Sequence, residues 1–271
     1  MKRKWLFVLP NLFTVSSIFC GIYAIVLATG AQGEDSARDF FRAAVAILFG
    51  MLFDGFDGRV ARLTRTQSDF GVQLDSLADV ITFGVAPALL LYKWALAPWG
   101  IWGVLVAAIF AICGALRLAR FNVMASGESG PSSYFTGLPI PLAAGMVVAV
   151  VVASTHGPQP QALPALPVAI LALVLSYLMV STIRYHSFKK VHLHRREIAV
   201  LVGVLLVGAV IAVRVRPSLV LVAYFSGYVL LGLVEEIVFH RRRARELSLA
   251  TPGALAVGDD EGEDDDQDGE G

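Results

Sequence analysis

The stretch that decides the fold runs from residue 54 to residue 79 and reads DGFDGRVARLTRTQSDFGVQLDSLAD. Its flanks are strongly apolar, yet it carries aspartates at positions 54, 57, 75 and 79. Asp54 and Asp57 are about one helical turn apart, and so are Asp75 and Asp79, so each pair shares a helix face. A carboxylate in a bilayer costs roughly 2.5–3.5 kcal/mol on insertion scales, which makes such acids functional candidates. Two such pairs on facing helices predict an oxygen-lined site for hard divalent cations.

The rest of the chain has the composition of a membrane protein. Of its 271 residues, 56% are apolar and 16% are charged, and the mean hydropathy is +0.67, which excludes an ordinary soluble domain. Apolar runs that can cross a hydrocarbon core of roughly 30 Å recur along the chain. We therefore expect an all-α, polytopic membrane bundle of about eight spans. They lie at residues 12–28, 43–56, 80–96, 101–116, 138–153, 163–183, 198–213 and 219–239. The second and third spans are expected to continue as helices through their aspartates.

The basic residues predict how this bundle lies in the membrane. With the N-terminus in the cytosol, most Lys and Arg fall on the cytosolic side, as the positive-inside rule requires. The exceptions among the 22 basic residues are Arg38, Arg42, Lys93, Arg214 and Arg216. Both termini and the aspartates are thus expected at the cytosolic face of the cell membrane.

By composition the chain divides into two parts. Residues 1–250 contain all the apolar runs and form the expected membrane domain. Residues 251–271 are rich in Gly, Asp and Glu and have almost nothing to bury, so we expect a disordered acidic tail. Cys20 and Cys113 fall inside expected spans, so neither a disulfide nor a thiolate metal site is predicted.

Acids inside a membrane also occur in ion pairs, in transporters and in membrane prenyltransferases. Pairing with Arg59 and Arg62 would leave surplus negative charge in the absence of a cation. A transporter keeps its acids scattered over several helices near the midplane. A membrane prenyltransferase carries a second aspartate-rich motif, which we do not find in this sequence. The concentration of acids on two consecutive spans favours an active site.

One motif in the stretch resembles the signature of the CDP-alcohol phosphotransferase family at every fixed position. It reads D-x2-D-G-x2-A-R-x8-G-x3-D-x3-D from Asp54 to Asp79. The resemblance implies an integral membrane enzyme that transfers a phosphatidyl-type group from a CDP-linked donor to an alcohol and releases CMP. It also implies a two-metal site for Mg²⁺ or Mn²⁺, because divalent cations neutralise a diphosphate under attack.

The resemblance also assigns roles to single residues. The implied metal ligands are Asp54, Asp57, Asp75 and Asp79, and Asp79 also matches the proposed general base. The residues implied beside the CDP-linked donor are Gly58, Ala61 and Arg62, while Gly71 matches a close-packing position. Asn11 and Thr14 enter the first span on the same side and either contact the diphosphate or cap their helix.

Further segments resemble the bacterial and archaeal phosphatidylserine synthase branch of the family. They are LPNLFT at 9–14 leading into FCG at 19–21, RLARFN at 117–122 and FTGLPIP at 135–141. This branch implies CDP-diacylglycerol as donor and L-serine as acceptor. Arg117, Arg120 and Asn122 are the expected serine-binding residues, since guanidinium groups suit a carboxylate.

The amino-acid sequence leaves alternatives for the two arginines and for the acceptor alcohol. Arg117 and Arg120 would equally serve as positive-inside anchors, and they are expected to begin a cytosolic loop. Another acceptor, such as glycerol 3-phosphate or an inositol phosphate, is the nearest alternative to serine. A homodimer is implied by the family, membrane lipids are the expected neighbours, and no nucleic-acid partner is expected.

Overall fold

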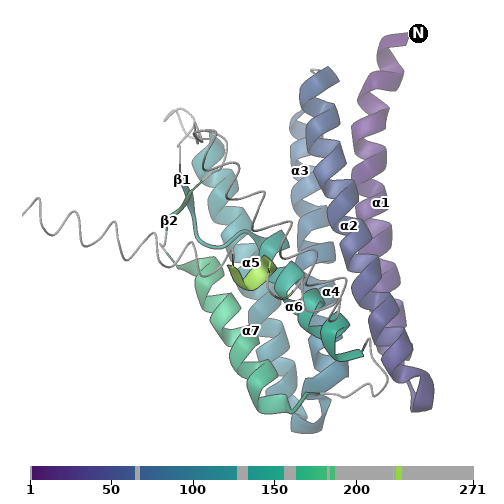
Figure 1. Ribbon diagram of the computed structural model, residues 1–271. Coiled ribbons are helices and arrows are strands. Elements are labelled where there is room, and N and C mark those ends of the chain that lie inside the picture. Colours follow the sequence, from purple (N-terminus) through teal and green to yellow (C-terminus); the bar gives the residue numbers. More distant parts are fainter. Residues whose placement is uncertain are drawn as a thin grey trace, which may run out of the picture.

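The computed structural model describes residues 2–64, 68–126, 134–155, 163–181, 184–186, 222 and 224–227. Within these ranges the protein is helical apart from one short pair of strands (Figure 1). The expected span at 198–213, most of the span at 219–239 and the acidic tail lie outside the described residues.

Helices α1 (Lys2–Gly30) and α2 (Ser36–Thr64) form a long antiparallel hairpin (Figure 1). A single 3-10 turn, η1 (Gly33–Asp35), joins them. α2 continues as a helix through Asp54 and Asp57, as predicted. In apolar surroundings the backbone N–H and C=O groups find partners only inside a continuing helix, so the acids do not break it.

The next part of the chain is one long helical path of changing pitch. It contains α3 (Asp69–Asp79), the π-helical η2 (Val80–Val85), α4 (Ala86–Leu91), the π-helical η3 (Tyr92–Leu96) and the 3-10 turn η4 (Ala97–Trp99). Ser68 caps α3, since its Oγ accepts a hydrogen bond from the Gly71 N–H at 3.1 Å. Pro87 lacks an N–H and crowds the carbonyl one turn before it, which accounts for a wide π turn just ahead of it.

Helix α5 (Ile101–Ser126) is longer than the expected span at 101–116. Arg117 and Arg120 therefore lie on a helix, and the prediction that they begin a loop was wrong. The physical reason is that protein groups engage both side chains. Arg117 is buried, and Arg120 donates hydrogen bonds to carbonyl groups near the end of another helix.

Two shorter apolar helices complete the described bundle, α6 (Ile140–Thr155) and α7 (Ala165–Val180). The strand β1 (Tyr134–Thr136) pairs antiparallel with β2 (Arg184–His186), so the segments before α6 and after α7 lie side by side (Figure 1). The Leu138 N–H also donates to the Leu178 carbonyl at 3.0 Å. The start of α6 is thus fixed to the end of α7.

The packing of α1, α2 and η2 centres on Thr82, whose side chain is fully buried. Its Oγ1 donates to the Ser17 carbonyl at 3.0 Å, and the Ser17 Oγ donates to the Gly50 carbonyl at 3.2 Å. A Cβ atom at Gly21 would lie 2.9 Å from the Thr82 Cα, and one at Gly50 would lie 2.5 Å from its Cγ2. Glycine at both positions therefore allows three backbones to approach closely.

Within the described part of the chain, three helical stretches are long and apolar enough to cross a membrane, namely Asn11–Gly30, Phe70–Trp99 and Ile101–Met124. Large apolar side chains point away from the protein, such as Phe19 at 68% exposure and Trp102 at 69%. A face of this kind suits lipid and not water. These findings support a membrane protein, while the full number of spans and the side of each terminus stay predictions.

Replacing Gly50 by alanine should destabilise the fold. The new methyl group would press on Thr82, which hydrogen bonds hold in place, and such overpacking typically costs about 1–3 kcal/mol. Gly55→Ala on the same helix is the control, because a Cβ there meets nothing within 4 Å. We expect a lower thermal midpoint in detergent for Gly50→Ala alone. Equal midpoints for both variants would contradict the packing described here.

Candidate active site

The aspartates of the motif come together where α2 faces α3. One carboxylate oxygen each from Asp54, Asp57 and Asp75 lies within 4.8 Å of the others. The Asp79 carboxyl group lies within side-chain hydrogen-bonding reach of that of Asp54. The structure therefore brings the two predicted pairs into one acidic cluster, with three members close together and Asp79 beside them.

This cluster has the chemistry of a site for a hard cation. The Asp57 side chain is buried, and so are the Oδ1 atoms of Asp75 and Asp79, which find no hydrogen-bond partner among the described residues. Buried oxygens without partners are costly, and adjacent negative charges add to that cost. A divalent cation with oxygen ligands would remove both costs. The residues present fit Mg²⁺ or Mn²⁺, and Asp54, Asp57 and Asp75 are the three whose oxygens already lie together to hold it. The ligand role implied for Asp79 stays a prediction.

Thr14 supports this set from α1. Its hydroxyl donates to Asp57 Oδ2 at 2.9 Å, and both side chains are buried. Of the roles left open for Thr14, a diphosphate contact or a helix cap, the structure shows neither directly. It shows a hydroxyl that fixes one oxygen of a candidate metal ligand, which is the usual task of an outer-shell residue.

Asn11 lies one turn before Thr14, next to the start of α3. A Cβ atom at Gly71 would stand 3.5 Å from Asn11 Oδ1 and 3.2 Å from Ser68 Oγ. The absence of a side chain at Gly71 therefore lets α1 approach the first turn of α3. This arrangement agrees with the close-packing role implied for Gly71.

The three expected serine-binding residues have different surroundings. Arg117 is only 7% exposed, its guanidinium lies 5.7 Å from the centre of the Phe121 ring, and it interacts electrostatically with Asp79. Arg120 donates to the carbonyls of Val180 at 2.9 Å, Ser181 at 3.2 Å and Met179 at 3.4 Å. Arg117 is thus directed to the acidic cluster, whereas Arg120 holds the end of α7.

Asn122, the third of these residues, joins α5 to α3. Its Nδ2 donates to Ser76 Oγ at 2.8 Å, and Ser76 directly follows Asp75 in the chain. Ser76 was not among the predicted site residues, because a serine between an aspartate and a leucine follows no recognisable pattern. Ser68 was also missed, although a serine just before an apolar helix is a common N-cap signal.

The residues expected beside the donor follow Asp57 along α2. Gly58 is half-buried, and the side chains of Ala61 and Arg62 lie outside what the structure describes. Their contribution to donor binding stays a prediction.

Comparison with known proteins gives a consistent picture. The sequence model of the family described as CDP-alcohol phosphatidyltransferase matches residues 7–180. The CDP-diacylglycerol–serine O-phosphatidyltransferase of Helicobacter pylori strain 26695 is 39% identical over 245 residues, 88% of this chain and 98% of the relative. That of Bacillus subtilis is 39% identical over 183 residues, 67% of this chain and 92% of the relative. The archaetidylserine synthase of Methanothermobacter thermautotrophicus is 36% identical over 179 residues, 65% of this chain and 69% of the relative.

Removal of the Thr14 hydroxyl should weaken cation binding. Thr14→Val leaves Asp57 Oδ2 without this donor, and outer-shell changes typically cost 10- to 100-fold in metal affinity. Titration of the purified protein with Mn²⁺, followed by electron paramagnetic resonance, measures the effect without catalysis.

Two control variants accompany this measurement. Thr14→Ser keeps the hydroxyl and should bind Mn²⁺ as the wild type does. Thr29→Val removes a hydroxyl that donates only to carbonyls of its own helix, those of Ile25 and Val26, and should have no effect. Unchanged affinity in Thr14→Val would show that this hydrogen bond does not support the cation.

Proposed function

Because the chain belongs to the CDP-alcohol phosphatidyltransferase family, we propose that it is a CDP-diacylglycerol–serine O-phosphatidyltransferase. It transfers the phosphatidyl group of CDP-diacylglycerol to the hydroxyl of L-serine and thereby makes phosphatidylserine, a step of phospholipid biosynthesis. The observation that carries this proposal is the similarity to two relatives named as serine O-phosphatidyltransferases, over 88% and 67% of the chain.

The reaction replaces the phosphoanhydride bond of the donor by a phosphate ester to serine. The serine hydroxyl oxygen forms a bond to the phosphorus on the diacylglycerol side of the diphosphate, and the bond from that phosphorus to the CMP oxygen breaks. The hydroxyl proton goes to a base of the protein, and CMP leaves with the electron pair. Catalysis therefore needs charge neutralisation at the diphosphate, a nearby base and a site for the serine carboxylate.

The acidic cluster meets the first requirement. Asp54, Asp57 and Asp75 would hold Mg²⁺ or Mn²⁺, and the bound cations would supply positive charge that neutralises the diphosphate. Gly58, Ala61 and Arg62 follow on the same helix and would contact the donor, and Arg62 would steady its phosphate oxygens. Thr14 would keep Asp57 in position.

Asp79 is the candidate base. It lies beside the three clustered aspartates and within hydrogen-bonding reach of Asp54, so its carboxyl group adjoins the proposed place of phosphoryl transfer. A carboxylate that only ligates a cation is a weak base, because the cation holds its lone pairs. The position of Asp79 next to the three-residue set supports a division of labour, in which Asp79 accepts the serine proton.

Arg117 is the candidate partner of the serine carboxylate. It is buried, positively charged and close enough to Asp79 to interact with it. Serine bound through its carboxylate at Arg117 would carry its hydroxyl toward the proposed base, and a guanidinium makes strong paired hydrogen bonds to a carboxylate. Arg120 is a positioning residue in this scheme, since it joins α5 to α7.

The setting of the enzyme completes the proposal. The chain is a multi-pass protein of the cell membrane with about eight spans, its termini and acidic cluster face the cytosol, and two copies form a homodimer. The distribution of Lys and Arg supports the orientation, and the family supports the dimer.

The decisive experiment measures CMP release by the purified protein. CDP-diacylglycerol and Mg²⁺ or Mn²⁺ are supplied with L-serine, glycerol 3-phosphate or inositol phosphate in parallel reactions. We expect serine-dependent CMP release with phosphatidylserine as product. Release with a different alcohol alone would retain the family reaction and refute the serine acceptor.

Asp79→Asn should reduce the rate of transfer by about 10²- to 10⁴-fold, the usual contribution of a general base. Its Mn²⁺ affinity should change little, because the three-aspartate set remains. Turnover and Mn²⁺ titration on the same preparation test both statements. If affinity falls in step with turnover, Asp79 is a metal ligand and not a separate base.

Arg117→Gln should raise KM for serine roughly 10- to 100-fold, the effect of losing a hydrogen bond between charged groups. KM for CDP-diacylglycerol should change much less. Arg120→Gln is the matched comparison, and it should lower the thermal midpoint because three carbonyls near the end of α7 lose a donor. Equal effects on both substrates in Arg117→Gln would contradict a specific role toward serine.

A further inference from the structure

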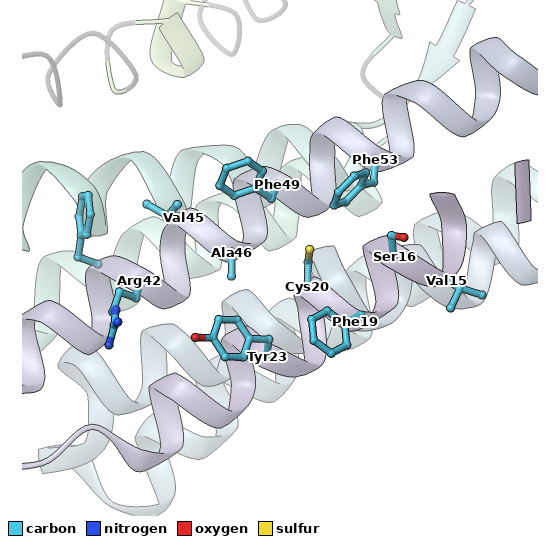
Figure 2. A pocket seen from close by; sticks show the side chains of 11 residues that line it. Val15, Ser16, Phe19, Cys20, Tyr23, Arg42, Val45, Ala46, Phe49 and Phe53 are labelled. Carbon is cyan, nitrogen blue, oxygen red and sulfur yellow. The ribbon is translucent and has the colours of Figure 1, made fainter. Parts of the chain in front are cut away.

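The outer face of the α1–α2 hairpin carries an apolar groove that the proposed reaction does not use. Its volume is about 740 Å³, and Phe19 of α1 and Phe49 of α2 lie on its two sides (Figure 2). Val15 lies at the Phe53 end of the groove and Val45 at the Arg42 end. Phe19 and Phe49 are 68% and 51% exposed, so the groove opens to the membrane.

This face is distinct from the one that carries the acidic cluster. Thr14 and Ser17 of α1 are buried and hydrogen-bond to Asp57 and to the Gly50 carbonyl, which marks the inner side of the hairpin. At about 100° per residue, Val15, Phe19 and Tyr23 of the groove fall on the side of α1 opposite Thr14 and Ser17, and they are 50%, 68% and 45% exposed. Helical geometry therefore places the groove on the outer side.

The two ends of the groove differ in chemistry. Toward the acidic cluster it ends at Phe53, which is joined to Phe56 through Phe13 by ring contacts with centroid separations of 6.4 and 6.1 Å. At the other end lie Arg42 and the Tyr23 hydroxyl, which points toward the same end in Figure 2. One end is lined by the aromatic ring of Phe53, and the other presents a cation and a hydroxyl.

The length of the groove corresponds to half a bilayer. With a rise of 1.5 Å per residue, Arg42 and Phe53 lie roughly 16 Å apart along α2. The hydrocarbon core is roughly 30 Å thick, and the apolar stretch Asn11–Gly30 of α1 crosses it once. On α1 the groove residues Val15 and Tyr23 lie roughly 6 and 18 Å from the Asn11 end of this stretch, so the groove runs across the middle of the membrane. Its Arg42 end points to the side away from the aspartates, because α1 and α2 are antiparallel.

Most of the guanidinium N–H donors of Arg42 are available to a phosphate. Its side chain is 52% exposed, and its single ion pair among the described residues is to Asp39 at 3.9 Å. A guanidinium carries five N–H donors and binds phosphate through paired hydrogen bonds, so one long contact leaves most of them available. From this depth the side chain can extend to the headgroup level of the far leaflet.

We propose that the groove binds an anionic phospholipid of the leaflet opposite the acidic cluster. The lipid phosphate contacts Arg42, and one acyl chain lies along the groove as far as Phe53. This site is separate from the acidic cluster, because the groove lies on the side of α1 away from Thr14, which hydrogen-bonds to Asp57. The proposal rests on the membrane setting alone and does not depend on the transfer reaction.

Photo-cross-linking of the full chain in phosphatidylcholine nanodiscs tests this site. The probe is phosphatidylglycerol with a photoreactive diazirine in the middle of one acyl chain, and mass spectrometry locates the labelled peptides. We expect labelling of residues 15–23 and 41–53. Arg42→Gln should reduce it roughly fivefold, which corresponds to about 1 kcal/mol per basic residue at an anionic lipid surface. Lys93→Gln, which removes an exposed cation outside the groove, should leave labelling unchanged.

Further variants and probes distinguish the possible outcomes. Val45→Trp fills the groove and should abolish labelling while Arg42 is intact, and transfer activity of each variant shows that it is folded. Equal labelling in Arg42→Gln and wild type, or by a phosphatidylcholine probe, would overturn the proposal. Cross-links to a second copy of the chain at these peptides would make the groove a subunit interface. Labelling by a CDP-diacylglycerol probe that competes with phosphatidylglycerol would assign the groove to the donor.

Discussion

Carboxylate groups a few ångströms apart repel strongly where water is scarce, because the Coulomb energy rises as the effective dielectric constant falls. This protein places oxygens of Asp54, Asp57 and Asp75 within 4.8 Å of one another at the end of an apolar helix hairpin, with Asp79 beside them. Fixed donors, a fixed cation of the protein, a bound metal ion or a proton held by one of the carboxyl groups can offset such repulsion. Thr14 and Arg117 supply part of this offset from α1 and α5. The remaining negative charge is what a divalent cation would neutralise.

The packing around the site opposes the separation of these charges. Thr82 follows Asp79 by less than one turn, is fully buried and donates to α1, while Gly21 and Gly50 allow the close approach. Arg120 and Leu138 connect α5 and α6 to the last turn of α7. A site of this kind needs such a scaffold, because it has to hold like charges together before any substrate arrives.

Much of this arrangement was predictable from the amino-acid sequence. The spacing of the aspartates indicated which of them share a helix face, and the apolar run before Asp54 indicated that α2 would continue through it. The separate surroundings of Arg117 and Arg120 were not predictable, because both arginines follow an apolar span in the same way. Only tertiary contacts decide that one faces the acids and the other the carbonyls of α7. The Thr14 partner and the pairing of β1 with β2 depend likewise on contacts between segments far apart in the chain.

The π-helical segment η2, which follows Asp79, changes the direction in which the later side chains of the same helix point. In a regular α-helix the direction of the side chains repeats every 3.6 residues. The directions of two distant faces of one such helix are therefore fixed relative to each other. A wide turn shifts this relation, because it accommodates more residues per turn. Asp75 and Asp79 before η2 are thus oriented independently of Leu90 and Leu91 after it, which are fully buried. One continuous helix can serve two neighbours in different directions without a loop inside the membrane.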